Sequence, residues 1–154
     1  IDSLAPNALM KQLYMSLNYD LVKAEYTYGD SRIDFYMEKN GEKFLTEVKG
    51  CTLSDDLHPG IGLFPDAPTE RGVKHLHELT KATKEGYRTA IAFVIQMNGI
   101  HRVLPNETAQ PEFKKALVEA AKAGVQIVCY SCHVEADRVK ITGVIEDISR
   151  FMNM

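Results

Sequence analysis

Three side chains in the first half of the chain, Asp34, Glu47 and Lys49, have the types and spacing for metal-dependent chemistry. The pair Asn40-Gly41 lies between two runs of alternating apolar residues, which is the strongest short signal for a two-residue hairpin turn. The register of such a hairpin places Asp34 opposite Glu47, with both side chains on one face. Lys49 shares that face, because side chains two apart in a strand point to the same side.

Two carboxylates in this geometry repel each other unless a cation lies between them. Mg²⁺ or Mn²⁺ prefers carboxylate and water oxygens, and such an ion can polarise a phosphate and generate hydroxide. Lys49 would orient the attacking water or neutralise charge in the transition state. The three residues therefore indicate phosphodiester hydrolysis. The alternative is an ordinary surface ladder of paired charges, and the pattern taken alone favours that alternative.

Hydrophobic periodicity predicts the elements that position these residues. The stretch 51–68 is rich in proline and glycine, so we expect it to form an irregular, mobile or ligand-contacting loop. Asp66 begins the next helix as its cap or serves as a further metal contact, and the cap is the preferred interpretation. The order of elements predicts one α/β domain over residues 1–154, a mixed sheet flanked by helices. The predicted helices are 8–17, 66–86 and 111–123, and the predicted strands are 21–28, 31–38, 43–48, 89–96, 125–134 and 138–145.

Composition describes an ordinary globular protein: 154 residues, of which 45% are hydrophobic and 25% charged. No apolar stretch approaches the roughly 20 residues that cross a bilayer, so we expect no membrane contact and a cytoplasmic location. The net charge of −3 limits any nucleic-acid surface to a local patch. Cys129 and Cys132 match a C-x-x-C-H haem-attachment string, but they lie in a predicted strand. We therefore expect two buried thiols.

A local basic patch is predicted on the helix that follows the proline-rich stretch. Arg71 and His75 lie on one stripe of that helix and could clamp a phosphate, and Lys74 adds a third basic side chain. A solvated helix face is the alternative. Gln96, at the end of the apolar strand 89–96, either reaches the active-site edge or is a strand-terminal polar residue.

The order helix, three strands, helix, strand is that of the PD-(D/E)xK nucleases, with Asp on the second strand and E-x-K on the third. Three segments, 31–35, 46–49 and above all Leu63–Leu76, resemble the sugar fermentation stimulation protein A family. The resemblance implies a restriction-endonuclease-like core preceded by a small barrel similar to an OB fold. This chain begins after the point where that barrel would end. The family is described as DNA-binding and linked to sugar metabolism.

The resemblance assigns metal ligation to Asp34, Glu47 and the main-chain carbonyl of Val48, and the activating role to Lys49. Many PD-(D/E)xK enzymes also present a Glu from the first helix, where this chain offers Asn7. That departure leaves the metal site one carboxylate poorer. Two functions follow as expectations: a Mg²⁺- or Mn²⁺-dependent nuclease acting on DNA, or a catalytically weak or inactive DNA-binding regulator linked to sugar (maltose) metabolism.

Overall fold

The computed structural model describes residues 5–64, 70–106 and 111–147. Helices and strands alternate along these residues much as the periodicity predicts. In chain order the elements are α1 (Pro6–Ser16), β1 (Leu21–Tyr28), β2 (Ser31–Lys39), β3 (Glu42–Cys51), β4 (Leu53–Asp55), β5 (His58–Phe64), α2 (Glu70–Lys84), β6 (Arg88–Ile95), β7 (Arg102–Pro105), α3 (Pro111–Ala123), β8 (Gln126–Val134) and β9 (Val139–Asp147).

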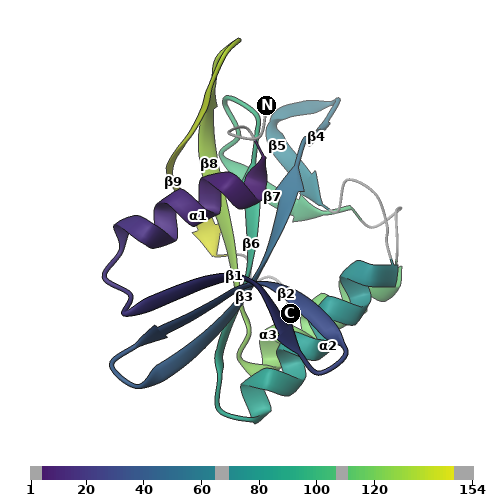
Figure 1. Cartoon of the computed structure of the whole chain (residues 1–154). Coiled ribbons are helices and arrows are strands. Elements are labelled where there is room, and N and C mark those ends of the chain that lie inside the picture. The colour runs from purple at the N-terminus through teal and green to yellow at the C-terminus, as the bar shows by residue number, and fades with distance from the viewer. Residues whose placement is uncertain (1–4, 65–69, 107–110, 148–154) are drawn as a thin grey trace.

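The main sheet has six strands in the order β1-β2-β3-β6-β8-β9. Its centre is parallel, because β6 pairs in parallel with both β3 and β8, while β1, β2 and β9 pair antiparallel at the two sides. Figure 1 shows α1 across one face of this sheet and α2 beside α3 on the other. The predicted mixed α/β sheet flanked by helices is therefore confirmed.

Each face of the sheet has its own apolar core. Leu76 and Leu79 of α2 and Leu117 of α3 are completely buried in one cluster with Ile91 and Ile95 of β6. On the other face α1 packs over a second cluster formed from alternate residues of the same strands, among them Phe35, Met37, Val48, Ala92 and Val94. Below, these are called the α2 face and the α1 face.

The hairpin between β2 and β3 has the predicted turn and register. Asn40 and Gly41 both have positive φ, at 51° and 80°, as the mirror-image turns that fit strand twist require. The paired residues run in the predicted register from Lys39 opposite Glu42 to Phe35 opposite Thr46. The turn therefore brings the two strands that carry the candidate site side by side.

The predicted irregular loop at 51–68 is wrong over much of its length, because β4 and β5 lie within it and form a second, three-stranded sheet with β7. Gly60 and Gly62, whose type suggested an irregular loop, are sites of close packing within β5. A Cβ on Gly60 would lie 2.3 Å from the ring of His101, and one on Gly62 would lie 3.3 Å from Ile100. The short strand β7 was not predicted.

The helix predicted at 66–86 is described from Glu70, and Asp66 lies outside the described residues. Gly86 follows α2 with φ of +100°, as expected for the residue after a helix end. The cysteines are free and buried, as predicted, and burial raises the pKa of the Cys132 thiol to about 11. In the described part of the chain, no helix combines the length and apolar character needed to span a membrane.

Candidate metal centre

The β1–β2 ladder is interrupted at Asp34. The paired residues pass from Ala24 opposite Phe35 to Tyr26 opposite Ile33, and the intervening Glu25 has φ of +57°. Phe35 packs in the α1-face core, whereas Ile33 packs in the α2-face core. Residues two apart in a regular strand share a face, so strand β2 changes faces at Asp34.

The β2–β3 pairing ends at Phe35 opposite Thr46, so the predicted opposition of Asp34 and Glu47 is not among the paired residues, and Asp34 meets β3 through its carboxylate. Its Oδ2 accepts a hydrogen bond of 2.7 Å from the backbone N–H of Val48 in β3. Its Oδ1 accepts one of 2.9 Å from the side-chain amide of Asn7 in the first turn of α1. Asp34 is thus fixed by β3 on one side and by α1 on the other. Asn7, where related enzymes present a carboxylate, acts here as a donor.

Glu47 is the buried member of the carboxylate pair. Only 2% of it is exposed, and its Oε1 lies 3.4 Å from Nδ1 of His75. Burial raises the pKa of Glu47 well above its ordinary value, the neighbouring Asp34 carboxylate raises it further, and the cations of Lys49 and Arg71 lower it. Among the described residues, Glu47 Oε2 has no hydrogen-bond partner. A buried carboxylate oxygen without a partner is an unfavourable arrangement unless another group binds it.

Helix α2 supplies the basic groups on this side of the site. His75 is buried, and burial together with the charges of Lys49 and Arg71 lowers its pKa to about 4, so its ring is neutral near pH 7. It faces Glu47 rather than solvent. Arg71 is exposed one turn earlier, and Lys74 is also exposed but donates a 3.3 Å hydrogen bond to the main-chain oxygen of Asp30.

The C-terminal end of β3 packs against α1 at Gly50. A Cβ on Gly50 would lie 2.9 Å from Cγ of Pro6 and 3.5 Å from Oε1 of Gln96. Gly50 follows Lys49 directly, and Pro6 precedes Asn7, so this contact sets how closely α1 approaches the site. The Gln96 side chain therefore lies at the C-terminal end of β3, beside the candidate site.

The donor set can be tested for a metal ion. The described residues contain no cluster of three or more His, Cys, Asp or Glu side chains that could hold one. The pair of Asp34 and Glu47 nevertheless offers carboxylate oxygens, one of them buried and without a partner. Main-chain oxygen, water and carboxylate are the ligands of Mg²⁺ and Mn²⁺, which often bind through only one or two carboxylates. The residues present fit a hard divalent cation of this kind.

Comparison with known proteins identifies the family. The family model described as "Sugar fermentation stimulation protein RE domain" matches residues 2–138. The chain belongs to the sugar fermentation stimulation protein family. A homologue from Ruminiclostridium cellulolyticum is 43% identical over 150 residues, which cover 95% of this chain and 65% of the relative. One from Desulfitobacterium hafniense is 43% identical over 145 residues, covering 91% of this chain and 61% of the relative.

A solved structure of a family member is also similar. The structure of SfsA from Pyrococcus furiosus in complex with Ca²⁺ matches with a TM-score of 0.77 and 27% sequence identity, over 89% of this chain and 59% of that one. This sugar fermentation stimulation protein chain therefore spans about three fifths of the length of the relatives that it matches.

In this family member, the fold brings together most of the residues that the sequence singles out. Asp34, Glu47, Lys49, Asn7 and Gln96 lie at or beside one site. The buried contact between His75 and Glu47 was not predicted. Helical spacing places His75 on a stripe with Arg71, but spacing alone does not tell which side of the stripe the sheet covers.

Proposed function

We propose that this chain is a PD-(D/E)xK nuclease-like domain that binds a divalent cation and hydrolyses phosphodiester bonds of DNA. The observation that carries the proposal is the carboxylate pair of Asp34, which is half-buried, and Glu47, which is buried and has an unpartnered oxygen, with the cations of Lys49 and Arg71 close by. The relative from Pyrococcus furiosus, solved in complex with Ca²⁺, supports a preference for hard cations.

Asp34, Glu47 and the main-chain carbonyl of Val48 would hold the cation, Mg²⁺ or Mn²⁺. When bound, such an ion supplies a polarised phosphate oxygen and a water of lowered pKa. Lys49 would orient that water or stabilise charge on the phosphate in the transition state. Asn7 holds the Asp34 carboxylate, and Arg71 offers an exposed guanidinium to a neighbouring phosphate.

The second candidate is a DNA-binding or regulatory protein, linked to sugar (maltose) metabolism, that retains this fold with weak or no turnover. The amide of Asn7 favours it. An amide that donates to Asp34 adds no negative charge to the site, where many enzymes of this class contribute a further carboxylate. The metal would then be held by fewer charges, and its affinity would fall.

One assay separates the two functions. Purified protein is incubated with supercoiled plasmid in Mn²⁺, in Mg²⁺ and in EDTA, and nicking and gel retardation are measured on the same samples. We expect nicking in Mn²⁺ that EDTA and Lys49→Ala both abolish. Retardation without nicking supports the regulatory alternative. A protein that neither retards nor nicks the plasmid contradicts both.

A further inference from the structure

The α1 face of the sheet contains a cavity of about 320 Å³, bounded by α1, β3, β6 and β8, which extends past the start of β6 to Thr83 of α2. Its floor is formed by side chains that alternate with those of the metal centre. Thr46 lines the cavity, and the next residue, Glu47, points to the α2 face. The cavity is thus a separate site, one residue away along β3. Its volume lies within the range of pockets that hold small molecules, about 300–1,000 Å³.

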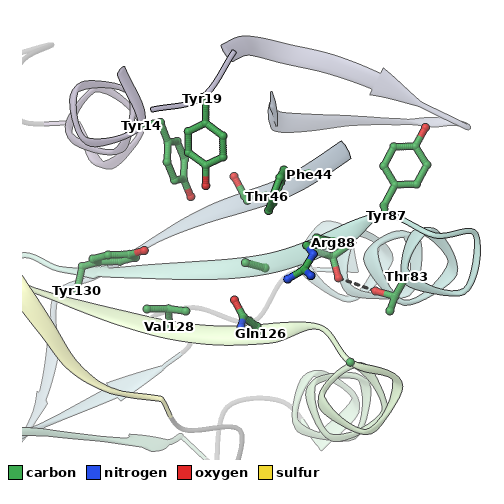
Figure 2. A pocket seen from close by; sticks show the side chains of 13 residues that line it. Tyr14, Tyr19, Phe44, Thr46, Thr83, Tyr87, Arg88, Gln126, Val128 and Tyr130 are labelled. Atoms are coloured by element: carbon green, nitrogen blue, oxygen red, sulfur yellow. Dashed lines mark hydrogen bonds between the residues drawn. The ribbon is translucent and has the colours of Figure 1, made fainter. Parts of the chain in front are cut away.

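Hydroxyl groups gather at this cavity. Figure 2 shows the side-chain oxygens of Tyr14, Tyr19, Tyr130 and Thr46 directed toward one space, although the residues come from distant parts of the chain. Burial raises the pKa of the Tyr14 hydroxyl, the Thr46 side chain lowers it, and Tyr130 and Tyr19 raise it further, which agrees with this convergence. A hydroxyl both donates and accepts hydrogen bonds, so such a set is suited to a ligand that also carries hydroxyls.

One of these hydroxyls lacks a partner although it is buried. Thr46 is only 4% exposed, and its Oγ1 makes no hydrogen bond of good geometry with the described residues, although the Tyr14 hydroxyl lies beside it. A buried hydroxyl without a partner destabilises a protein by about 1–3 kcal/mol. Thr46 lines the cavity, so a ligand held there can supply the missing partner.

The charge at the cavity favours an uncharged ligand. Arg88 is the one charged side chain among the described residues that line it, and its guanidinium lies 2.6 Å from the carboxylate of Glu42. That pair leaves little net charge facing the cavity. An anionic ligand would therefore have to compete with Glu42 for Arg88.

The aromatic rings favour a saturated ligand over a flat one. The rings of Tyr14 and Tyr19 are inclined at 87°, and those of Tyr19 and Phe44 at 77°. A flat base is held best between parallel or offset ring planes, and these neighbouring rings offer none. Perpendicular rings instead present faces and edges to the C–H groups of a small saturated ring.

We propose that the cavity between α1, β3, β6 and β8 binds an uncharged monosaccharide, held by the hydroxyls of Tyr14, Tyr19, Thr46 and Tyr130. The aromatic rings of Tyr19 and Phe44 contact its C–H faces. This binding requires neither metal nor DNA, so it stands independently of the proposed nuclease function.

The proposal is tested by titrating the protein, without metal, with D-glucose, glucose 6-phosphate and adenosine, followed by calorimetry and saturation-transfer NMR. We expect saturable binding of glucose, with no gain from the phosphate and none for adenosine. Tyr130→Phe and Thr46→Val should each weaken glucose binding about three- to tenfold, the effect of one hydrogen bond. Tyr36→Phe, which removes a hydroxyl bonded to Glu38 outside the cavity, should leave it unchanged.

Three results would overturn the proposal. One is the lack of saturable glucose binding by wild-type protein. Another is a tenfold preference for glucose 6-phosphate or for adenosine, which would make Arg88 or ring stacking the anchor. The third is an equal loss in Tyr36→Phe and Tyr130→Phe. Circular dichroism melts verify that each variant is folded, and NMR contacts from wild-type tyrosine protons to glucose provide a measurement that needs no variant.

Discussion

The two faces of β3 carry opposite kinds of buried polar chemistry at adjacent residues. On the α2 face Glu47 is buried beside a second carboxylate, a histidine and two cations. On the α1 face Thr46 is buried among tyrosines in a cavity. Among the described residues that line this cavity, only Arg88 is charged, and it pairs with Glu42. The two sites lie on opposite faces of the sheet simply because successive side chains of a strand point to opposite sides. One strand therefore presents a charged site suited to a cation and a neutral site suited to hydroxyls.

The largest effect is expected from Lys49→Ala, which tests the charged face. Loss of the ammonium should reduce plasmid nicking about 10²- to 10³-fold, as removal of one transition-state stabiliser does. Mn²⁺ binding, measured by calorimetry, should change little because the carboxylates remain. Glucose binding on the other face should be unaffected. Equal nicking by wild type and variant, from preparations free of contaminating nuclease, would remove Lys49 from the mechanism.

The contact between Gly50 and Pro6 links the two faces, and Gly50→Ala should disturb both. The added Cβ would lie 2.9 Å from Pro6, so the first turn of α1 must shift and carry Asn7 away from Asp34. We expect a loss of about 1–3 kcal/mol in the free energy of unfolding, as for other overpacked contacts, together with weaker Mn²⁺ binding.

Gly41→Ala is the comparison for that experiment. Gly41 has open space around its Cβ position, but its φ is +80°, so alanine there strains the turn without touching α1. We expect it to lower stability while leaving the affinity for Mn²⁺ per folded molecule unchanged. Weaker Mn²⁺ binding in both variants would mean that lost stability, and not the α1 contact, affects the site.

The charged site was predictable because its signal is local. The Asn40-Gly41 turn fixes the register of β2 and β3 as far as Phe35 opposite Thr46, the residues next to the two carboxylates, which lie close enough for Asp34 to raise the pKa of Glu47. The change of faces at Asp34 was not predictable, because it depends on the positive φ of Glu25 in the neighbouring strand. The burial of His75 depends on how α2 packs, which spacing within the helix does not specify.

The neutral cavity and the second sheet could not be predicted for a related reason. The tyrosines that meet at the cavity come from α1, the segment after it and β8, and no spacing in the chain connects them. The strand β5 contains Gly60 and Gly62, which resemble loop residues in a sequence. Their lack of a side chain is explained only by His101 and Ile100, which occupy that space from 38 or more residues away in the chain.

The basic residues of α2 should produce a smaller effect, on DNA binding. The double variant Arg71→Ala, Lys74→Ala should weaken binding equally across sequences and flatten its salt dependence by about one to two units of slope. Most of this change should come from Arg71, because Lys74 already donates to Asp30.

The matched control for the basic residues is Lys81→Ala, Lys84→Ala. It removes the same charge from the other end of α2, where Lys81 lies over the ring of Tyr28. Its salt slope should remain that of the wild type. Equal slopes in the two double variants would assign DNA attraction to overall charge and not to a surface beside the candidate metal centre.

The smallest effect separates a hydroxyl kept for a ligand from one kept for the fold. Thr46 and Thr89 both line the cavity and are similarly buried, at 4% and 5% exposure. Thr89 Oγ1 lies 2.5 Å from Thr83 Oγ1, whereas Thr46 Oγ1 makes no hydrogen bond of good geometry with the described residues. Valine keeps the shape of threonine and removes the hydroxyl. Thr89→Val should therefore lower the free energy of unfolding by about 1 kcal/mol, and Thr46→Val should raise it by up to about 1 kcal/mol. Thermal and urea melts of ligand-free protein measure both changes.

Saturating glucose should make the wild type more stable than Thr46→Val, because only the wild type gains the hydrogen bond to the ligand in the cavity. If Thr46→Val destabilises ligand-free protein as much as Thr89→Val does, the Thr46 hydroxyl stabilises the fold. Thr46 then gives no support for a ligand in the cavity.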